Sequence, residues 1–236
     1  MRTVGLVLAL ALVGCGGDDG GKGKDAGDDT PSDSGSGSNP GLDAPIDAAP
    51  MATGCTTTTP SSTFTNTICG PWGAANGAAP VVNDMNATLR IEPLGDQTSE
   101  GRCTSNAMLT IPDGGIFVEV PMPIVATAGY AALRLGGIDV SINSRDNKLR
   151  LTNAAGTVTI AQVPFVAGAM RWWRLRPDRT SDEIVGEYSA DATAWYEVGR
   201  VARTLTTMTP LELAAGSENP TATVGNAVFD NLNLCP

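Results

Sequence analysis

Short segments of alternating apolar and polar residues recur along most of the chain. Successive residues of a β-strand point to opposite faces of a sheet, so such alternation predicts strands with one buried face. The segments follow one another at intervals of roughly 8–12 residues. Gly, Pro, Asn and Asp separate them, and residues 112–115 are one such turn. The predicted strands include 87–91, 116–120, 138–142, 148–152, 157–160, 184–188 and 211–215. This pattern predicts an all-β sandwich or barrel without a helix of ordinary length.

The N-terminal end has a different pattern, with Arg2 followed by a continuous apolar run from Val4 to Val13. This run is too short to span the roughly 30 Å hydrocarbon core of a membrane, so residues 1–14 are predicted to be a signal peptide. Residues 12–15, Leu-Val-Gly-Cys, resemble the bacterial lipobox, whose cysteine sulfur carries a diacylglyceryl group. The resemblance implies lipidation of Cys15 and anchoring in a membrane. An ordinary secretory signal with an incidental cysteine is the alternative.

The residue after the cysteine is Gly16, and in lipoproteins the residue at this position influences whether the protein stays at the inner membrane or moves to the outer membrane. In Gram-negative lipoproteins an aspartate there favours retention at the inner membrane. The resemblance therefore implies an exported protein that is lipid-anchored at the outer membrane or the cell surface.

Residues 15–50 form a segment of Gly, Asp, Ser, Pro and Ala that contains almost no apolar bulk. Such a composition cannot bury enough surface to offset the entropy of ordering, so a disordered linker is predicted before one folded domain at 51–236. Eight aspartates against two lysines place more than half of the chain's net charge of −10 in this linker. Calcium binding by these aspartates is an alternative to a spacer, but they lack the spacing of an EF-hand loop. No cofactor is expected.

Charge and composition exclude several classes of function. A net charge of −10 without a basic tract argues against nucleic-acid binding. The sequence contains no histidine, which excludes His-dependent serine and cysteine triads and most zinc enzymes.

Four cysteines remain beyond Cys15, namely Cys55, Cys69, Cys103 and Cys235. An even number in an exported domain predicts two disulfides, and four cysteines allow three connectivities. From the spacing of the residues alone, all three connectivities stay open.

The C-terminal third carries a series of motifs in a characteristic order: 171–176 (RWWRLR), 183–191 (ending S-A-D), 194–198 (AWYEV) and 227–234 (AVFDNLNL). This order resembles the concanavalin A-like lectin/glucanase superfamily, including the laminin-G-like jelly rolls, over about residues 164–234. The N-terminal half is similar only around Trp72 and 86–92. The resemblance implies a two-sheet antiparallel jelly-roll sandwich.

Two details follow from this resemblance. Because the first and last strands pair in such folds, it implies the disulfides Cys55–Cys235 and Cys69–Cys103. The glycine that usually follows the aspartate of the S-x-D motif is Ala192 here, so the turn at this point is expected to differ.

Strand alternation divides the residues of 171–176 between two faces. Trp173 and Leu175 share one face, and Leu175 indicates that this face points into the core. Trp172, Arg174 and Arg176 share the other face. These three residues are the candidate ligand-binding group, because an outward tryptophan beside arginines can stack on a sugar ring. Alternatively, the aliphatic stems of the arginines simply cover the tryptophan.

Other conspicuous residues have structural interpretations first. Asp191 and Asp230 are expected to cap turns rather than bind a metal. The aromatic residues expected in the core are Phe117, Tyr188, Trp195 and Phe229.

Catalysis is not expected from the carboxylates. Glucanases of this superfamily use an E-x-D-x-E strand, whereas retaining glycosidases in general need two carboxyl groups about 5–5.5 Å apart. Glu183 and Glu187 share a strand face at roughly 13 Å, and Glu119 stands alone between valines. The favoured hypothesis is a non-catalytic carbohydrate-binding domain at the membrane surface. A structural or adhesive envelope protein and a glycoside hydrolase with carboxylates from different strands remain as alternatives.

Overall fold

The computed structural model describes residues 52–65, 68–83, 87–95, 97–136, 140–153, 158–202, 208–219 and 223–236. The predicted signal peptide, Cys15 and the predicted linker lie outside these residues. No helix within the described ranges is both long and apolar enough to cross a membrane.

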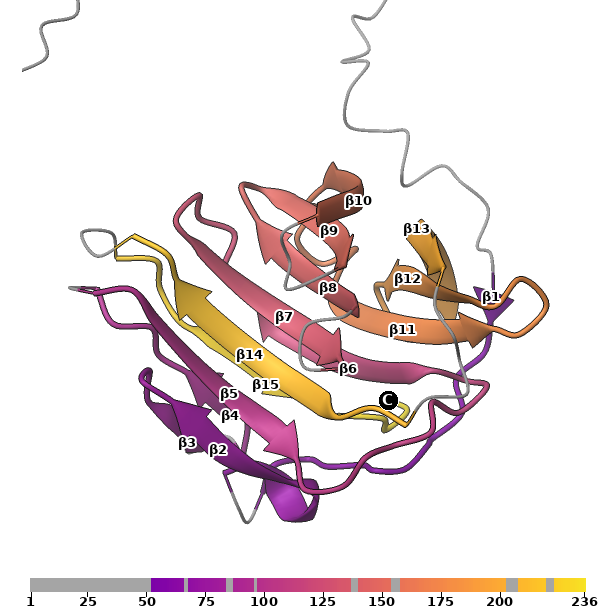
Figure 1. Cartoon of the computed structure of the whole chain (residues 1–236), viewed down its shortest axis with the longest axis horizontal. Coiled ribbons are helices and arrows are strands. Elements are labelled where there is room, and N and C mark those ends of the chain that lie inside the picture. Colours follow the sequence, from indigo (N-terminus) through magenta and orange to yellow (C-terminus); the bar gives the residue numbers. More distant parts are fainter. Residues whose placement is uncertain are drawn as a thin grey trace, which may run out of the picture. The chain divides into compact units, whose positions relative to one another are not determined.

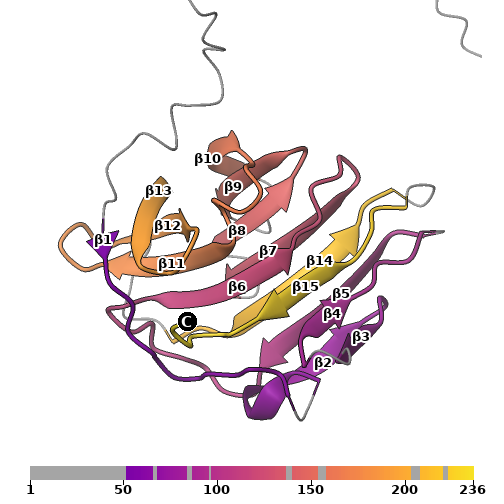
Figure 2. The ribbon, with the colours of Figure 1, turned by 180° about the vertical axis from the view of Figure 1, so that it is seen from behind.

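Two antiparallel sheets stack face to face with their strands nearly aligned (Figures 1 and 2). The first sheet has the strand order β1 (Ala52–Thr53), β13 (Ala194–Ala202), β12 (Glu183–Ser189), β11 (Trp172–Asp178), β6 (Ile116–Met122), β15 (Ala227–Asp230), β4 (Leu89–Ile91) and β3 (Val81–Asn83). The second sheet has the order β10 (Val158–Pro164), β9 (Lys148–Asn153), β8 (Val140–Arg145), β7 (Gly129–Leu135), β14 (Leu211–Ser217), β5 (Ser99–Ser105) and β2 (Gly73–Gly77). A short 3₁₀ helix, η1 (Gly70–Trp72), precedes β2. The all-β jelly-roll sandwich predicted from the sequence is confirmed.

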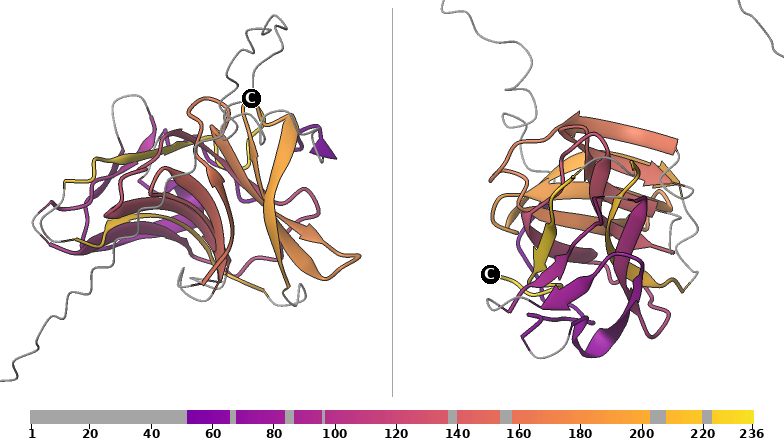
Figure 3. Two further views of the ribbon diagram at one scale, coloured as in Figure 1. Left: turned by 90° about the horizontal axis from the view of Figure 1, so that it is seen from above. Right: turned by 90° about the vertical axis from the view of Figure 1, so that its left-hand side faces the viewer.

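The main core lies between the two sheets and is built from the inward residues of each strand. Trp173 is completely buried there, and its indole Nε1 donates to the carbonyl oxygen of Met170 at 2.9 Å. The prediction that Trp173 faces the core is therefore confirmed. At one side of the sandwich, Gly199 of β13 lies directly against Ala161 of β10, where no larger residue fits. Figure 3 shows the two layers from further directions.

A second, smaller apolar cluster lies on the outer face of the eight-stranded sheet. It contains Phe117, Trp172, Ala192 and Trp195, all buried. Phe117 packs its ring against both indoles, at centroid distances of 6.2 Å to Trp172 and 6.0 Å to Trp195. The expected burial of Phe117 and Trp195 is thus confirmed, but in this cluster rather than between the sheets.

The two ends of the domain hold this cluster closed. We use "the strap" for residues 54–58 and 231–235, which the Cys55–Cys235 disulfide joins. The backbone of Thr58 donates to the Asn233 carbonyl at 3.1 Å, and that of Asn233 donates to the Phe117 carbonyl at 2.8 Å. These contacts hold the strap against the sheet, which explains why both faces of β6 are buried along most of its length.

The second disulfide joins Cys69 to Cys103, so the structure has the pairing that the resemblance implied. Cys69 precedes η1, and Cys103 lies on β5. Two disulfides are typical of proteins that fold in an oxidising compartment outside the cytoplasm.

The turn at Ala192 keeps a conformation that usually requires glycine. Ala192 has φ of +61°, in the left-handed region. The Asp191 carboxylate accepts hydrogen bonds from the backbone of Thr193 at 2.8 Å and Ala194 at 3.2 Å. These bonds lower the pKa of Asp191 to about 2, and the hydrogen bond from the Thr193 backbone has the largest effect. Asp191 therefore caps the turn, as expected.

Candidate functional site

Strand β7 presents polar residues on the outer face of the seven-stranded sheet. Ala131 and Leu133 point into the core, so the alternating Tyr130, Ala132 and Arg134 point outward. Small Ala132 at the centre of this strand leaves space for the longer side chains of its neighbours. Strand β7 thus supplies both the floor and two walls of a surface depression.

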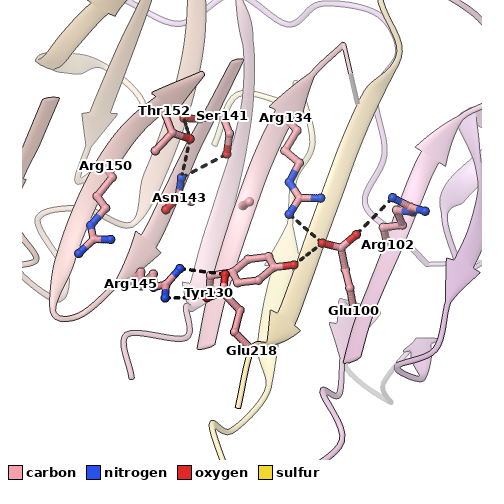
Figure 4. Close-up of a pocket in the computed structure, with 11 residues that line it drawn as sticks. Glu100, Arg102, Tyr130, Arg134, Ser141, Asn143, Arg145, Arg150, Thr152 and Glu218 are labelled. Carbon is pink, nitrogen blue, oxygen red and sulfur yellow. Dashed lines mark hydrogen bonds and ion pairs between the residues drawn. The ribbon is translucent and has the colours of Figure 1, made fainter. Parts of the chain in front are cut away.

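Neighbouring strands complete a cavity of about 170 Å³, which we call the groove (Figure 4). Its lining residues are Glu100, Arg102, Tyr130, Ala132, Arg134, Ser141, Asn143, Arg145, Arg150, Thr152 and Glu218. They come mainly from β5, β7, β8 and β9, at positions that alternate with core residues. Nearly all of them carry groups that donate or accept hydrogen bonds.

One side of the groove is fixed by a cluster around Glu100. The hydroxyl of Tyr130 and the guanidinium Nη2 of Arg134, the latter at 2.8 Å, both donate to the Glu100 carboxylate. Strand β14 runs between β5 and β7, and Gly216 is its residue opposite both Glu100 and Tyr130. A Cβ atom at Gly216 would lie 2.6 Å from the Tyr130 hydroxyl oxygen. The missing side chain therefore lets Tyr130 reach across the strand.

The electrostatic interactions within this cluster determine the protonation states of Glu100 and Tyr130. Burial raises the pKa of Glu100, but the hydrogen bond and charge of Arg134 outweigh it and hold the pKa below its usual value. Burial and the neighbouring carboxylate raise the pKa of Tyr130. Tyr130 therefore stays a neutral donor and Glu100 stays an ionised acceptor at neutral pH.

Asn143 lies at the centre of the groove with its orientation fixed. Its amide Nδ2 donates to the hydroxyl of Ser141 at 3.3 Å and to that of Thr152 at 3.1 Å. Both amide hydrogens are thus used, which leaves the carbonyl Oδ1 as the acceptor for a ligand. Figure 4 shows the side chain between Arg134 and Arg150.

Positive and negative charges balance in and around the groove. Four arginines face four carboxylates: Arg102 with Glu100 at 3.2 Å, Arg134 with Glu100 and with Glu212 at 3.8 Å, Arg145 with Glu218 at 2.6 Å, and Arg150 with Asp146 at 2.6 Å. Such a surface offers fixed donors and acceptors without a net charge. It suits a polar, uncharged ligand rich in hydroxyl groups.

The other features of the described residues offer less chemistry. A cavity of about 450 Å³ lies among the loops 122–127, 146–147 and 224–226, but Asp146 is its only charged lining residue and already pairs with Arg150. Within the described ranges, no three His, Cys, Asp or Glu side chains come together as a metal site would require. The groove is therefore the candidate site.

The candidate residues from sequence lie elsewhere, on the outer face of the eight-stranded sheet. Trp172 is only 3% exposed and Arg174 only 5%. The strap and the second apolar cluster cover Trp172, so it lacks the exposed ring face that stacking on a sugar requires. Arg174 and Arg176 both pair with the buried carboxylate of Glu187. The structure therefore favours the alternative in which neighbouring side chains cover Trp172.

Strands β5 and β7, which carry Glu100, Tyr130 and Arg134, are not among the strands predicted from the sequence. A signal was present: in 99–105 and 129–135, polar or aromatic residues alternate with Gly, Cys, Ala and Leu. The inward residues are small in β5 and in the first half of β7. The alternation of large apolar and polar residues that predicts a strand is therefore weak in both segments.

Comparison with known proteins gives similarity of architecture at low sequence identity. The chain is similar to a lectin from Bauhinia forficata in complex with GalNAc, with 10% identity over 73% of this chain and 95% of that chain and a TM-score of 0.48. It is also similar to a legume lectin-like domain from Entamoeba histolytica (10% identity, 67% and 87% coverage, TM-score 0.47) and to lectin I-B4 from Griffonia simplicifolia (9%, 69% and 92%, 0.46). The sequence matches no protein-family model and no curated protein. The residues of the groove are therefore the basis on which a function can be assigned.

Proposed function

We propose that the protein is a non-catalytic carbohydrate-binding lipoprotein whose groove binds a neutral sugar. The observation that carries this proposal is the fixed orientation of Asn143, which holds an acceptor between the guanidinium donors of Arg134 and Arg150. Adjacent hydroxyl groups of a sugar both donate and accept, so they match planar amide, guanidinium and carboxylate groups placed side by side. The ring of Tyr130 adds an aromatic surface at the edge of the groove.

The charge balance of the groove favours a neutral sugar over an acidic one. Each of the four arginines already has a carboxylate partner, so an acidic sugar would have to displace one of them. A hydroxyl group can instead bridge a guanidinium and its carboxylate without separating the pair. Binding is therefore expected to depend only weakly on salt.

The size of the groove favours one sugar unit. Its volume of about 170 Å³ lies below the range of about 300–1,000 Å³ that is typical of pockets for drug-sized ligands. A terminal or protruding sugar fits this space better than a long oligosaccharide enclosed along its length.

The carboxylates of the groove support a binding function over hydrolysis. A glycosidase needs one carboxylic acid with a raised pKa to protonate the leaving group. Arg134 lies between Glu100 and Glu212 and lowers the pKa of Glu100. This arrangement stabilises the ionised form, which accepts hydrogen bonds but cannot act as the acid.

The anchor completes the proposal. The lipobox-like residues ending at Cys15 support attachment to a membrane, at the outer membrane or cell surface, through a linker over 15–50. Strand β1, where the described chain begins, pairs with β13 of the eight-stranded sheet, whereas the groove lies on the other sheet.

A panel of immobilised glycans, probed with the purified chain, tests this function. The control pair is Arg150→Gln in the groove and Arg179→Gln, an exposed arginine near Asp113. A neutral glycan that binds the wild type and the Arg179→Gln variant, but binds Arg150→Gln about tenfold more weakly or worse, supports the groove. Capture of envelope proteins without any glycan signal would instead support the adhesive alternative.

A further inference from the structure

We propose a second binding site, for a small oxyanion, beneath the strap on the outer face of the eight-stranded sheet. A cavity of about 230 Å³ lies there, lined by residues that include Cys55, Thr56, Phe117, Arg174, Arg176 and Trp195. The groove lies on the other sheet, so the two sites are separate and this proposal does not depend on sugar binding.

The cavity has an excess of positive charge. Arg174 donates through Nε to Glu187 at 2.6 Å, and Arg176 pairs through Nη2 with the same carboxylate at 3.2 Å. Glu187 is fully buried, and in the described part of the chain neither arginine has an ion pair with another carboxylate. Two guanidinium groups thus share one carboxylate, and one positive charge is left over beside the cavity.

Two buried donors beside this charge have no acceptor. Arg174 Nη2 and Trp195 Nε1 are both inaccessible to solvent, and neither has a hydrogen-bond partner among the described residues. The guanidinium of Arg174 lies over the Trp195 ring, 4.0 Å from its centroid. This stacking stabilises the cation, but it supplies no acceptor to the indole N–H.

The charge of Arg174 is not fully compensated by the protein. Burial lowers the pKa of Arg174, and this effect outweighs the opposing influence of Glu187. A second negative group near the guanidinium would reverse that imbalance. The cavity therefore has an excess positive charge beside it, and two of its lining residues carry donors without an acceptor. These donors are closed to solvent in the free protein, so the side chains of Arg174 and Trp195 must shift for an anion to reach them.

The chemistry of the site defines the class of ligand. A carboxylate or a phosphate carries at least one negative charge and several acceptor oxygens within the reach of one guanidinium. A neutral sugar lacks the charge that the two arginines require. The ligand is consequently a small oxyanion, either a free inorganic ion or the carboxylate of a small molecule or chain end.

Titration of the purified full chain, with both disulfides formed, tests this site. Sodium acetate and sodium phosphate are added in turn while sodium chloride keeps the ionic strength constant, and tryptophan fluorescence and the melting temperature are recorded. We expect a saturable change that chloride alone does not produce. The stronger response of the two anions identifies whether the site prefers a planar carboxylate or a tetrahedral ion.

Three variants separate specific binding from a general effect of salt. Arg174→Lys keeps a charge but loses the planar donor set, and Trp195→Phe removes only the indole N–H and part of the ring. Each is expected to weaken anion binding at least tenfold, whereas Arg171→Lys, an exposed arginine next to the same strand, leaves it unchanged. If Arg174→Lys does not melt cooperatively, Trp195→Phe decides. The absence of saturation with both anions, or equal titration curves for wild type and Trp195→Phe, would overturn the proposal.

Discussion

The hydroxyl of Tyr130 on β7 donates a hydrogen bond to the carboxylate of Glu100 on β5, although β14 runs between these two strands. The contact passes over Gly216, which has no side chain to obstruct it. Three strands that are distant in sequence thus fix one wall of the groove. The precision of the candidate site thus depends on Gly216, which is not among the residues that line the groove.

Replacing Gly216 with alanine tests this dependence. The new Cβ atom would meet the Tyr130 hydroxyl at 2.6 Å and the Ser99 carbonyl at 2.8 Å, both too close for contact. We expect the Tyr130–Glu100 hydrogen bond to break and sugar affinity to fall about tenfold, which corresponds to about 1.4 kcal/mol. Affinity is measured by titration calorimetry. Gly114→Ala is the control, since the nearest atom there lies at 3.7 Å; similar affinities for the two variants would refute the role of Gly216.

The pH dependence of sugar binding follows from the same cluster. The pKa of Glu100 lies below its ordinary value, so its ionised form persists to lower pH in the folded state than in the unfolded chain. The stabilisation that this provides is present above the unfolded pKa, about 4.3, and is lost as the pH falls through the lower folded pKa. The chain has no histidine to titrate near neutrality. We expect a constant dissociation constant from about pH 5 to pH 9, measured in buffers of equal ionic strength; a step within this range would contradict the assignment.

Trp172 tests which of the two interpretations of this residue holds, sugar stacking or coverage by its neighbours. Its indole is buried against Phe117 beneath the strap. Trp172→Ala is therefore expected to lower the free energy of unfolding by about 3–5 kcal/mol, as large-to-small changes in a core do. Urea denaturation measures this change. The folded variant should bind sugar with wild-type affinity, and a selective loss of affinity at unchanged stability would show that Trp172 is part of the binding site.

The Cys55–Cys235 disulfide is expected to stabilise the domain strongly, because it joins residues 180 positions apart. Closing a loop of this length restricts the unfolded chain and contributes about 5 kcal/mol in the chain-entropy account. The Cys55→Ser, Cys235→Ser double variant is expected to lose stability by roughly that amount in urea denaturation. An unchanged midpoint would show that the strap stays closed without its covalent bond.

Local pattern was enough to predict an all-β fold, and the motif resemblance implied the two-sheet sandwich, but neither predicted its covered outer face. Segments such as 148–152 alternate strongly, and the structure forms β9 there. In β5, by contrast, Gly101 and Cys103 occupy inward positions, so the strand has almost no large apolar residues to alternate with its polar ones. The burial of Trp172 depends on a strap whose two halves come from opposite ends of the domain, and no local pattern reports such a contact.

The candidate site was unpredictable for a related reason. Glu100 and Arg134 are ordinary solvent-facing strand residues in sequence. They become a site only because the register of β5, β14 and β7 places Glu100 and Tyr130 on either side of Gly216, with Arg134 four residues further along β7. Register between strands is set by the whole sheet, so sequence patterns within one strand do not contain it.

The most direct test of the central claim compares the wild type with Asn143→Ala in calorimetric titrations with the neutral sugar that the glycan panel identifies. The substitution removes the fixed Oδ1 acceptor at the centre of the groove. We predict an affinity at least tenfold weaker, with a melting temperature and a fluorescence spectrum that show the sandwich intact. Binding of the sugar by Asn143→Ala with the affinity of the wild type would contradict the account, because the ligand would then not occupy the groove.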